Sequence, residues 1–303
     1  MPTTSGIQTV TVTVNGQTYN LTKNTSTGKY ETTITAPSTS SYNNNSEHYY
    51  PVSLTATDVA GNTVTANDQH ATLGSSLRLR VKETVAPTIN NLSPSNDSYL
   101  STSTPTVTAE LRDNDSGIDI TTLVIKVDNV AASSSSITKN AVSGGYDISY
   151  TTSALSDGAH TVTVQVSDND GNQSAVASTT FTVATTAPTL TITSPVDGYA
   201  TKTASLTVSG TTSTDATITV QLNSGSAQSV TVGSNGAFSK AITMSTEGEN
   251  TITIVATNPA GVTTTVTKTV IYDKTAPVFQ SIVITPNPTT TGSTYTITVE
   301  VTD

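Results

Sequence analysis

Two acidic clusters of the same composition could bind a metal ion. Asp113 and Asp115 flank an asparagine in the first cluster, and Asp168 and Asp170 flank an asparagine in the second. Ca²⁺ takes about six to eight oxygen ligands, some of them backbone carbonyls in turns. The second cluster is also a good hairpin turn, because Asp and Asn hydrogen-bond their own backbone and the Gly171 that follows accepts positive φ. Calcium binding and turn formation are therefore alternative hypotheses for these residues.

The chain offers little that could perform catalysis. Its three histidines, His48, His70 and His160, lie in unrelated segments, and His160 stands at the edge of a predicted strand, where a solvated histidine is common. The sequence has no Gly-x-Ser-x-Gly elbow, no His-Glu-x-x-His motif, no phosphate loop and no cysteine to act as a thiol nucleophile. We expect no catalytic residue, no cofactor other than a possible Ca²⁺ and no enzyme activity.

An aromatic group could bind a carbohydrate. Tyr42, Tyr49 and Tyr50 lie close to His48 in the sequence, and aromatic faces suit sugar rings. The alternative is that Tyr49 or Tyr50 fills the core while the other side chains decorate a loop.

Composition excludes several classes of partner. The formal charge is 12 − 22 = −10, with only 11% charged residues, so no basic stripe exists to neutralise the phosphates of a nucleic acid. Arg78, Arg80 and Lys82 form the densest basic spot, which we interpret as the outer face of a strand. No apolar run approaches the length of a membrane span, and residues 1–5 lack the basic and apolar regions of a secretory signal.

Strands and turns that would position these residues follow one another regularly. Apolar and polar residues alternate over 52–57, 162–167 and 252–257, which predicts strands with one buried face. An Asp/Asn-x-x-Gly cluster follows each run, at 58–61, 168–171 and 258–261, and predicts a turn. A further strand is expected after each turn, at 179–183, at 264–271 and, more distantly, at 76–81.

A recurring Ala-Pro motif divides the chain into similar parts. Pro87, Pro188 and Pro277 each follow Ala and lie 188 − 87 = 101 and 277 − 188 = 89 residues apart. Such spacing predicts an array of all-β sandwiches. We expect a first repeat (1–84) without its first two strands, a second repeat (85–185), a third repeat (186–274) and a terminal segment (275–303) of only two strands.

The two ends of the chain match neighbouring parts of the second repeat. The closing run 296–303 resembles 107–113, and the opening residues 5–7 repeat 116–118. One explanation is that the chain is a piece of a longer array. The other is strand donation, in which residues 277–303 of one molecule complete the first repeat of the next and so build head-to-tail assemblies.

Over residues 87–285, and most closely over 186–277, the chain resembles the bacterial Ig-like repeats of large surface proteins and adhesins. The resemblance implies tandem Ig-like β-sandwich domains in an elongated array that acts as a non-catalytic extracellular stalk or spacer. Some relatives bind calcium at domain junctions. Here the third junction keeps an acidic residue of the family type, Asp273, whereas the other two junctions offer Glu83 and Ala184.

The first repeat departs from that pattern. Its segments 47–51 and 72–77 look more like Ig-like parts of phage and prophage tail proteins. The sequence therefore leaves three functions open: a surface stalk, a phage tail component, and a carbohydrate-binding adhesion module. A host-surface or cell-wall glycan or protein is the expected partner, bound through a distal element.

Overall fold

The computed structural model describes residues 5–303, which form strands and two short 3₁₀ helices, η1 (Gly74–Leu77) and η2 (Ser134–Ser136). The predicted all-β class is confirmed. Residues Met1–Thr4, on which most of the signal-sequence prediction was based, lie outside the described part. Within residues 5–303, no helix reaches the length and apolar character needed to cross a bilayer. The chain divides into two compact units, one with residues up to 98 and 104–182, the other with residues 99–103 and 183–303.

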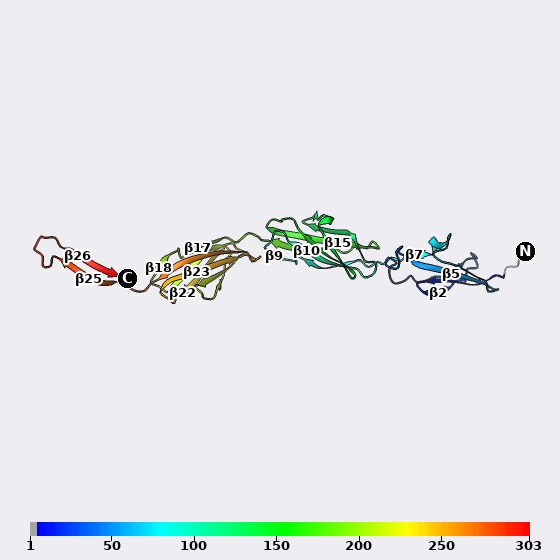
Figure 1. The fold of residues 1–303 in the computed structure, drawn as a ribbon, viewed down its shortest axis with the longest axis horizontal. Helices are drawn as coiled ribbons and strands as arrows, with labels where there is room; N and C mark the ends of the chain where they lie inside the picture. Colours follow the sequence, from blue (N-terminus) through cyan, green and yellow to red (C-terminus); the bar gives the residue numbers. More distant parts are fainter. Residues whose placement is uncertain (1–4) are drawn as a thin grey trace. The chain divides into compact units, whose positions relative to one another are not determined.

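The second repeat consists of two sheets (Figure 1). The first has the order β13 (Thr138–Val142), β14 (Gly145–Thr151), β10 (Thr106–Arg112) and β8 (Thr88–Ser93). The second has the order β12 (Val130–Ala131), β11 (Ile118–Val127), β15 (Gly158–Asp168), β16 (Ala177–Val183) and β9 (Ser98–Leu100). Alternate residues of β10 and β15 are buried and form much of the core: Val107, Ala109, Leu111, Val162, Val164 and Val166.

The third repeat has the same two-sheet organisation. One sheet has the order β17 (Leu190–Ser194), β19 (Ser205–Thr212) and β22 (Ala237–Thr243). The other has the order β18 (Tyr199–Thr201), β24 (Thr263–Tyr272), β23 (Gly248–Thr257), β20 (Thr217–Leu222) and β21 (Gln228–Val230). The predicted alternation in β23 is confirmed, because Ile252, Ile254 and Ala256 are fully buried in a core cluster of their own.

The three predicted turns share one hydrogen-bond pattern. The Oδ1 atoms of Asp58, Asp168 and Asn258 each accept the backbone N–H four residues on, at 2.8, 2.8 and 2.9 Å. The glycine three residues after each of them has φ between +86° and +96°, which a residue with a Cβ rarely adopts. Local chemistry therefore determines where these strands end.

The first repeat is built around one sheet. Its order is β2 (Gln17–Asn20), β1 (Ile7–Val14), β5 (Tyr50–Asp58) and β6 (Thr63–Ala66), and β7 (Arg78–Leu79) also pairs with β5. A small hairpin joins β3 (Thr22–Lys23) and β4 (Tyr30–Glu31).

The strand expected over 76–81 is present but much shorter, and the strand that directly follows the turn was missed. The strand that follows the turn is β6, and within 76–81 only Arg78 and Leu79 are extended in a strand. Asn67 ends β6, because its Oδ1 accepts the N–H of Gln69 and reverses the chain before η1.

The terminal segment is a single antiparallel hairpin of β25 (Val278–Thr285) and β26 (Thr296–Thr302), drawn at the red end of Figure 1. Every residue of both strands is exposed.

His160 lies in the core of the second repeat, and the expectation of a solvated histidine was wrong. Its side chain is 8% exposed, its Nδ1 lies 2.7 Å from Asp128 Oδ2, and its Nε2 lies 2.8 Å from the carbonyl of Ser156. Burial acts to lower the pKa of His160, but the hydrogen bonds to Asp128 and Ser156 outweigh it, and the pKa is raised. Burial likewise acts to raise the pKa of Asp128, but its bonds to His160 and Thr161 leave that pKa lowered.

This pair predicts a pH-dependent stability. A histidine whose pKa is higher in the folded state stabilises the fold fully at pH values below its unfolded pKa of about 6.5. This stabilisation is lost as the pH rises through the folded pKa. The lowered pKa of Asp128 acts at acidic pH: its contribution to stability is complete above about pH 3.9 and is lost as the pH falls through the folded pKa.

We expect the stability difference between the wild type and His160→Gln to shrink by roughly 1 kcal/mol between about pH 6 and about pH 9, the size of one hydrogen bond. Calorimetry at several pH values checks this. His70→Gln, which alters an exposed histidine, is the control, and an equal pH trend in both variants would contradict the prediction.

Candidate metal site

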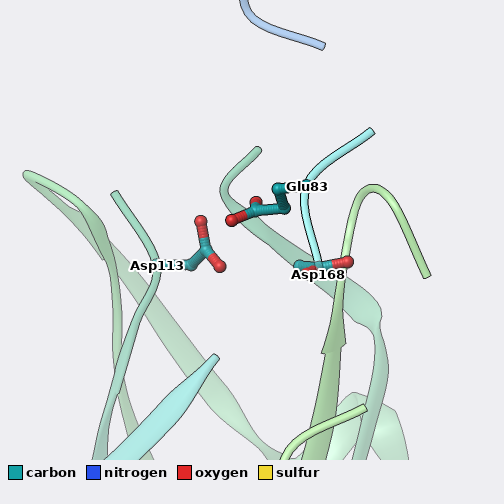
Figure 2. A group of neighbouring side chains, drawn as sticks. All are labelled: Glu83, Asp113 and Asp168. Carbon is teal, nitrogen blue, oxygen red and sulfur yellow. The ribbon is translucent and has the colours of Figure 1, made fainter. Parts of the chain in front are cut away.

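Two strand ends and one connecting segment of the first compact unit bring carboxylates together. Asp113 directly follows β10, Asp168 is the last residue of β15, and Glu83 lies between β7 and β8. One oxygen atom of each carboxylate lies within 4.8 Å of the other two (Figure 2). These positions are 30 and 55 residues apart in sequence, so the sandwich fold alone makes them neighbours.

Backbone hydrogen bonds hold the two aspartates. Asp113 Oδ1 accepts the N–H groups of Asp115 and Gly117, both at 2.9 Å, and Gly117 adopts φ +84°. Asp168 Oδ1 accepts the N–H groups of Asp170 and Asn172, and its Oδ2 accepts Nδ2 of Asn172 at 2.7 Å. Each side chain thus organises its own turn, and one oxygen of each lies within 4.8 Å of an oxygen of Glu83.

Glu83 is held from both sides. Its Oε1 accepts the backbone N–H of Ser116 at 2.7 Å, and its own N–H donates to Asp170 Oδ2 at 3.0 Å. Its carbonyl accepts Nδ2 of Asn172 at 3.2 Å. The segment that leads into the second repeat is therefore fastened to both acidic turns.

The cluster concentrates negative charge in a largely buried place. Asp113 is 9% exposed and Asp168 is 2% exposed. Burial raises the pKa of Glu83; the hydrogen bonds from Ser116 oppose this, and the charges of Asp113 and Asp115 add to it. An all-oxygen donor set of this kind fits Ca²⁺, which would neutralise the mutual repulsion of the carboxylates.

The fold brings together only some of the metal ligands that the sequence predicts. Asp113 and Asp168 converge, but the carboxylates of Asp115 and Asp170 accept backbone N–H groups. Asp115 receives Ser40 N–H at 2.8 and 3.1 Å, and Asp170 receives that of Glu83. Asp273 is outside this cluster, and its Oδ1 accepts the N–H of Thr275 at 2.9 Å.

Glu83 was absent from the predicted ligand set, although a signal for it exists. It lies four residues before Pro87, as Asp273 lies four residues before Pro277. An acidic residue four positions before the proline of the Ala-Pro motif therefore marks the junction between two repeats.

The third repeat uses an amide where the second uses a carboxylate. Asn258 occupies the turn position of Asp168, and its Nδ2 donates to the carbonyls of Ala184 and Thr186, both at 3.0 Å. An amide can bind the linker backbone directly, because it carries donors that a carboxylate lacks.

The tyrosines do not form one exposed platform. Tyr49 and Tyr50 are buried, with their hydroxyls bonded to Asp68 and to Thr39. Tyr42 stacks on His48 with ring centroids 4.0 Å apart. Two of the three candidate sugar-binding rings therefore belong to the core of the first repeat.

Known protein families match two parts of the chain. Residues 84–185 match the model of a bacterial Ig-like domain, and residues 188–274 match that of glucodextranase, domain B. The predicted likeness to bacterial Ig-like domains is confirmed for the second repeat, and the predicted fold of tandem Ig-like β-sandwiches is confirmed. No curated protein has a significantly similar sequence.

Two solved structures resemble this chain weakly. The titin I-band fragment I67–I69 has 14% identity and a TM-score of 0.41, with 89% of both chains covered. The fibronectin(III)-like modules of Clostridium thermocellum CbhA have 14% identity and a TM-score of 0.37, covering 62% of this chain and 94% of theirs. At this identity the similarity concerns the fold alone.

Proposed function

We propose that this chain is a non-catalytic mechanical spacer outside the cell, a stalk of a bacterial surface protein or adhesin. A distal element carried by the array would bind a glycan or protein on a host surface or cell wall. The Ig-like array supports the structural part of this proposal.

The observation that carries the proposal is the pairing of an early strand with the last strand of the third repeat. β18, near its start, runs parallel to β24, at its end, with Tyr199 opposite Val270 and Thr201 opposite Tyr272. A force that pulls the two ends of the repeat apart loads these hydrogen bonds in shear, so they must break together. The small core beneath them contains Val270, which is fully buried.

Single-molecule stretching of the full chain tests this. We expect separate unfolding events, each releasing about 300 Å, the extended length of roughly 90 residues. The chain has no cysteine, so Ala200→Cys with Ile271→Cys, which face each other across β18 and β24, can clamp the third repeat. Oxidation should remove most of one event, and a reductant should restore it. Smooth extension without events would contradict a load-bearing role.

The alternative is that the chain is part of a phage tail, because the first repeat resembles segments of tail proteins. Capsid and tail genes beside the coding gene would support that alternative, whereas a cell-wall anchoring sequence in the same reading frame would support the surface stalk. A sugar-binding role has less support, because Tyr49 and Tyr50 are buried; a glycan array probed with the full chain would test it.

Calcium binding by Glu83, Asp113 and Asp168 is proposed as a second function of the junction. The convergence of three carboxylates within 4.8 Å favours it. The ion would replace repulsion by attraction and tie the segment before β8 to the ends of β10 and β15. Asp115 and Asp170 would support the site by holding the backbone of Ser40 and Glu83.

A further inference from the structure

The third repeat leaves part of one strand edge without a partner. β22 pairs with β19 on one side, and on its other side residues 5–303 supply only a bridge between Phe238 and Val232. Beyond that bridge, the stretch 240–243 has no second neighbouring strand in the described part of the chain. Such an edge presents backbone N–H and C=O groups that can pair with another extended chain.

Hydrogen bonds near both ends of β22 show which backbone groups point outward. The N–H of Met244 donates to the carbonyl of Ala204 at 2.9 Å, so the even-numbered residues of β22 bond toward β19. The carbonyl of Ala237 instead accepts the N–H of Gly233 at 2.8 Å, on the other side of the strand. By the same alternation, both backbone groups of Ala241 point away from β19 and can bond to an added strand.

A groove of about 410 Å³ lies beside this edge. Ala241, Ile242 and Thr243 line one side, and residues of β20, of β21 and of the turn between them line the other. Val220 and Leu222 make that second side apolar, because they belong to or pack against the core cluster of the repeat. A strand paired with Ala241 therefore places alternate side chains against this core.

Lys240 carries the one charge of β22 and lies on its inner face. Phe238 and Ile242 flank it at a spacing of two residues and pack in the core cluster, so the lysine shares their face. Lys240 is half-buried, and within residues 5–303 its ammonium group makes no hydrogen bond or ion pair. A cation that is partly withdrawn from water is stabilised by a carboxylate beside it.

The equivalent position of the second repeat is uncharged. The two repeats are aligned by the pairs that their first strands make: Ile89 with Leu111, and Leu190 with Thr212. Four residues earlier in each case, Val107 pairs with Tyr150 and Val208 pairs with Lys240. The sandwich fold therefore does not require a lysine at this place.

We propose that the open edge of β22 binds an extended acidic segment of a partner protein by strand addition, with a carboxylate opposite Lys240. Because the backbone of Lys240 bonds toward β19, the residue opposite it belongs to a non-hydrogen-bonded pair, in which side chains approach most closely. Apolar partner residues two positions to either side of the carboxylate enter the groove. The third repeat thereby gains a binding role beyond that of a spacer.

Charge argues against a second copy of the chain as the occupant. Antiparallel pairing of two β22 edges about Ala241 places both Lys240 side chains on one face, within about 8 Å of each other. Like charges at that separation repel, whereas an acidic strand supplies the missing counter-charge.

Fluorescence anisotropy of labelled peptides with the full chain tests the proposal. The probe is a blocked peptide with Val-Thr-Glu-Thr-Val at its centre, compared with the same peptide carrying Lys in place of Glu. We expect the acidic peptide to bind at least about tenfold more tightly, the effect of one charge-assisted hydrogen bond. Lys240→Glu should reverse this preference, and Lys240→Tyr, which installs the residue of the second repeat, should abolish it. Equal binding of the two peptides by the wild type, or binding of neither, overturns the proposal.

Ala241→Pro separates strand addition from simple charge attraction. Proline removes the outward N–H that an added strand uses and spares the hydrogen bonds toward β19, as prolines on sheet edges do. We expect the acidic peptide to lose its affinity while calorimetry shows the unfolding transition of the third repeat retained. Ala241→Thr keeps the N–H and should bind like the wild type. Binding that survives Ala241→Pro, or peptide-free dimers that this variant disrupts, overturns strand addition by an acidic partner.

Discussion

Calcium is expected to raise the unfolding temperature of the wild-type chain, and Asp168→Asn is expected to lose this response. An ion present at 100 times its dissociation constant stabilises the folded state by about 2.7 kcal/mol, which corresponds to a shift on the order of 10 °C for a domain of this size. The physical reason is that Glu83, Asp113 and Asp168 repel one another within 4.8 Å until a cation lies between them. Calorimetry with Ca²⁺ and with EDTA measures the difference.

Asp58→Asn is the matched control for this experiment. Asp58 and Asp168 cap their turns in the same way, each accepting N–H and Nδ2 of the asparagine four residues on, but only Asp168 belongs to the carboxylate cluster. Asn258 shows that asparagine preserves such a turn, since its Oδ1 accepts the N–H of Ala260 and of Val262. The Asp58→Asn variant should therefore respond to Ca²⁺ like the wild type.

The same site predicts how calcium affinity depends on pH. Because burial and the neighbouring carboxylates raise the pKa of Glu83, protons compete with the cation there, and affinity should rise as the pH rises through that pKa. Glu83→Gln keeps an oxygen for the N–H of Ser116 but should lose most of the affinity and its pH dependence. A melting temperature unchanged by EDTA in the wild type would disprove the metal site.

Phe181→Ala is expected to destabilise the second repeat by about 3–5 kcal/mol and to leave the third repeat unchanged. Phe181 is 1% exposed on β16, and its ring lies against His160, with centroids 5.8 Å apart. Its removal leaves a cavity in a core that contains no tryptophan and no second phenylalanine.

The other two phenylalanines of the chain supply the controls. Phe238 is 4% exposed in the third repeat and packs beside Gly210, where an added Cβ would meet its ring at 2.9 Å. Phe238→Ala should therefore lower only the third-repeat transition by a similar amount. Phe279→Ala, in the exposed hairpin, should change neither transition. Calorimetry of the full chain measures the unfolding transition of each repeat in these variants. A single transition that shifts in both Phe181→Ala and Phe238→Ala would show that the repeats do not unfold independently.

Much of the fold was predictable because the signals are local. Alternation with period two decides which residues of β15 and β23 face the core, and the Asp/Asn-x-x-Gly turns end those strands through hydrogen bonds within four residues. Where local signals were weak, the prediction was less accurate: the strand expected over 76–81 is shortened to Arg78 and Leu79, and the chain first reverses at Asn67.

The sequence by itself determined the all-β class, the recurrence of the repeats and the acidic turns at Asp113 and Asp168, since each depends on neighbouring residues. Only the tertiary structure decided which carboxylates meet. The packing of the sheets brings the carboxylate of Glu83 to the ends of β10 and β15. The carboxylates of Asp115 and Asp170 instead accept the backbone N–H groups of Ser40 and Glu83. The structure also placed His160 against Asp128 in the core. Pairings between residues tens of positions apart depend on how strands pack, and that packing leaves no pattern in the local sequence.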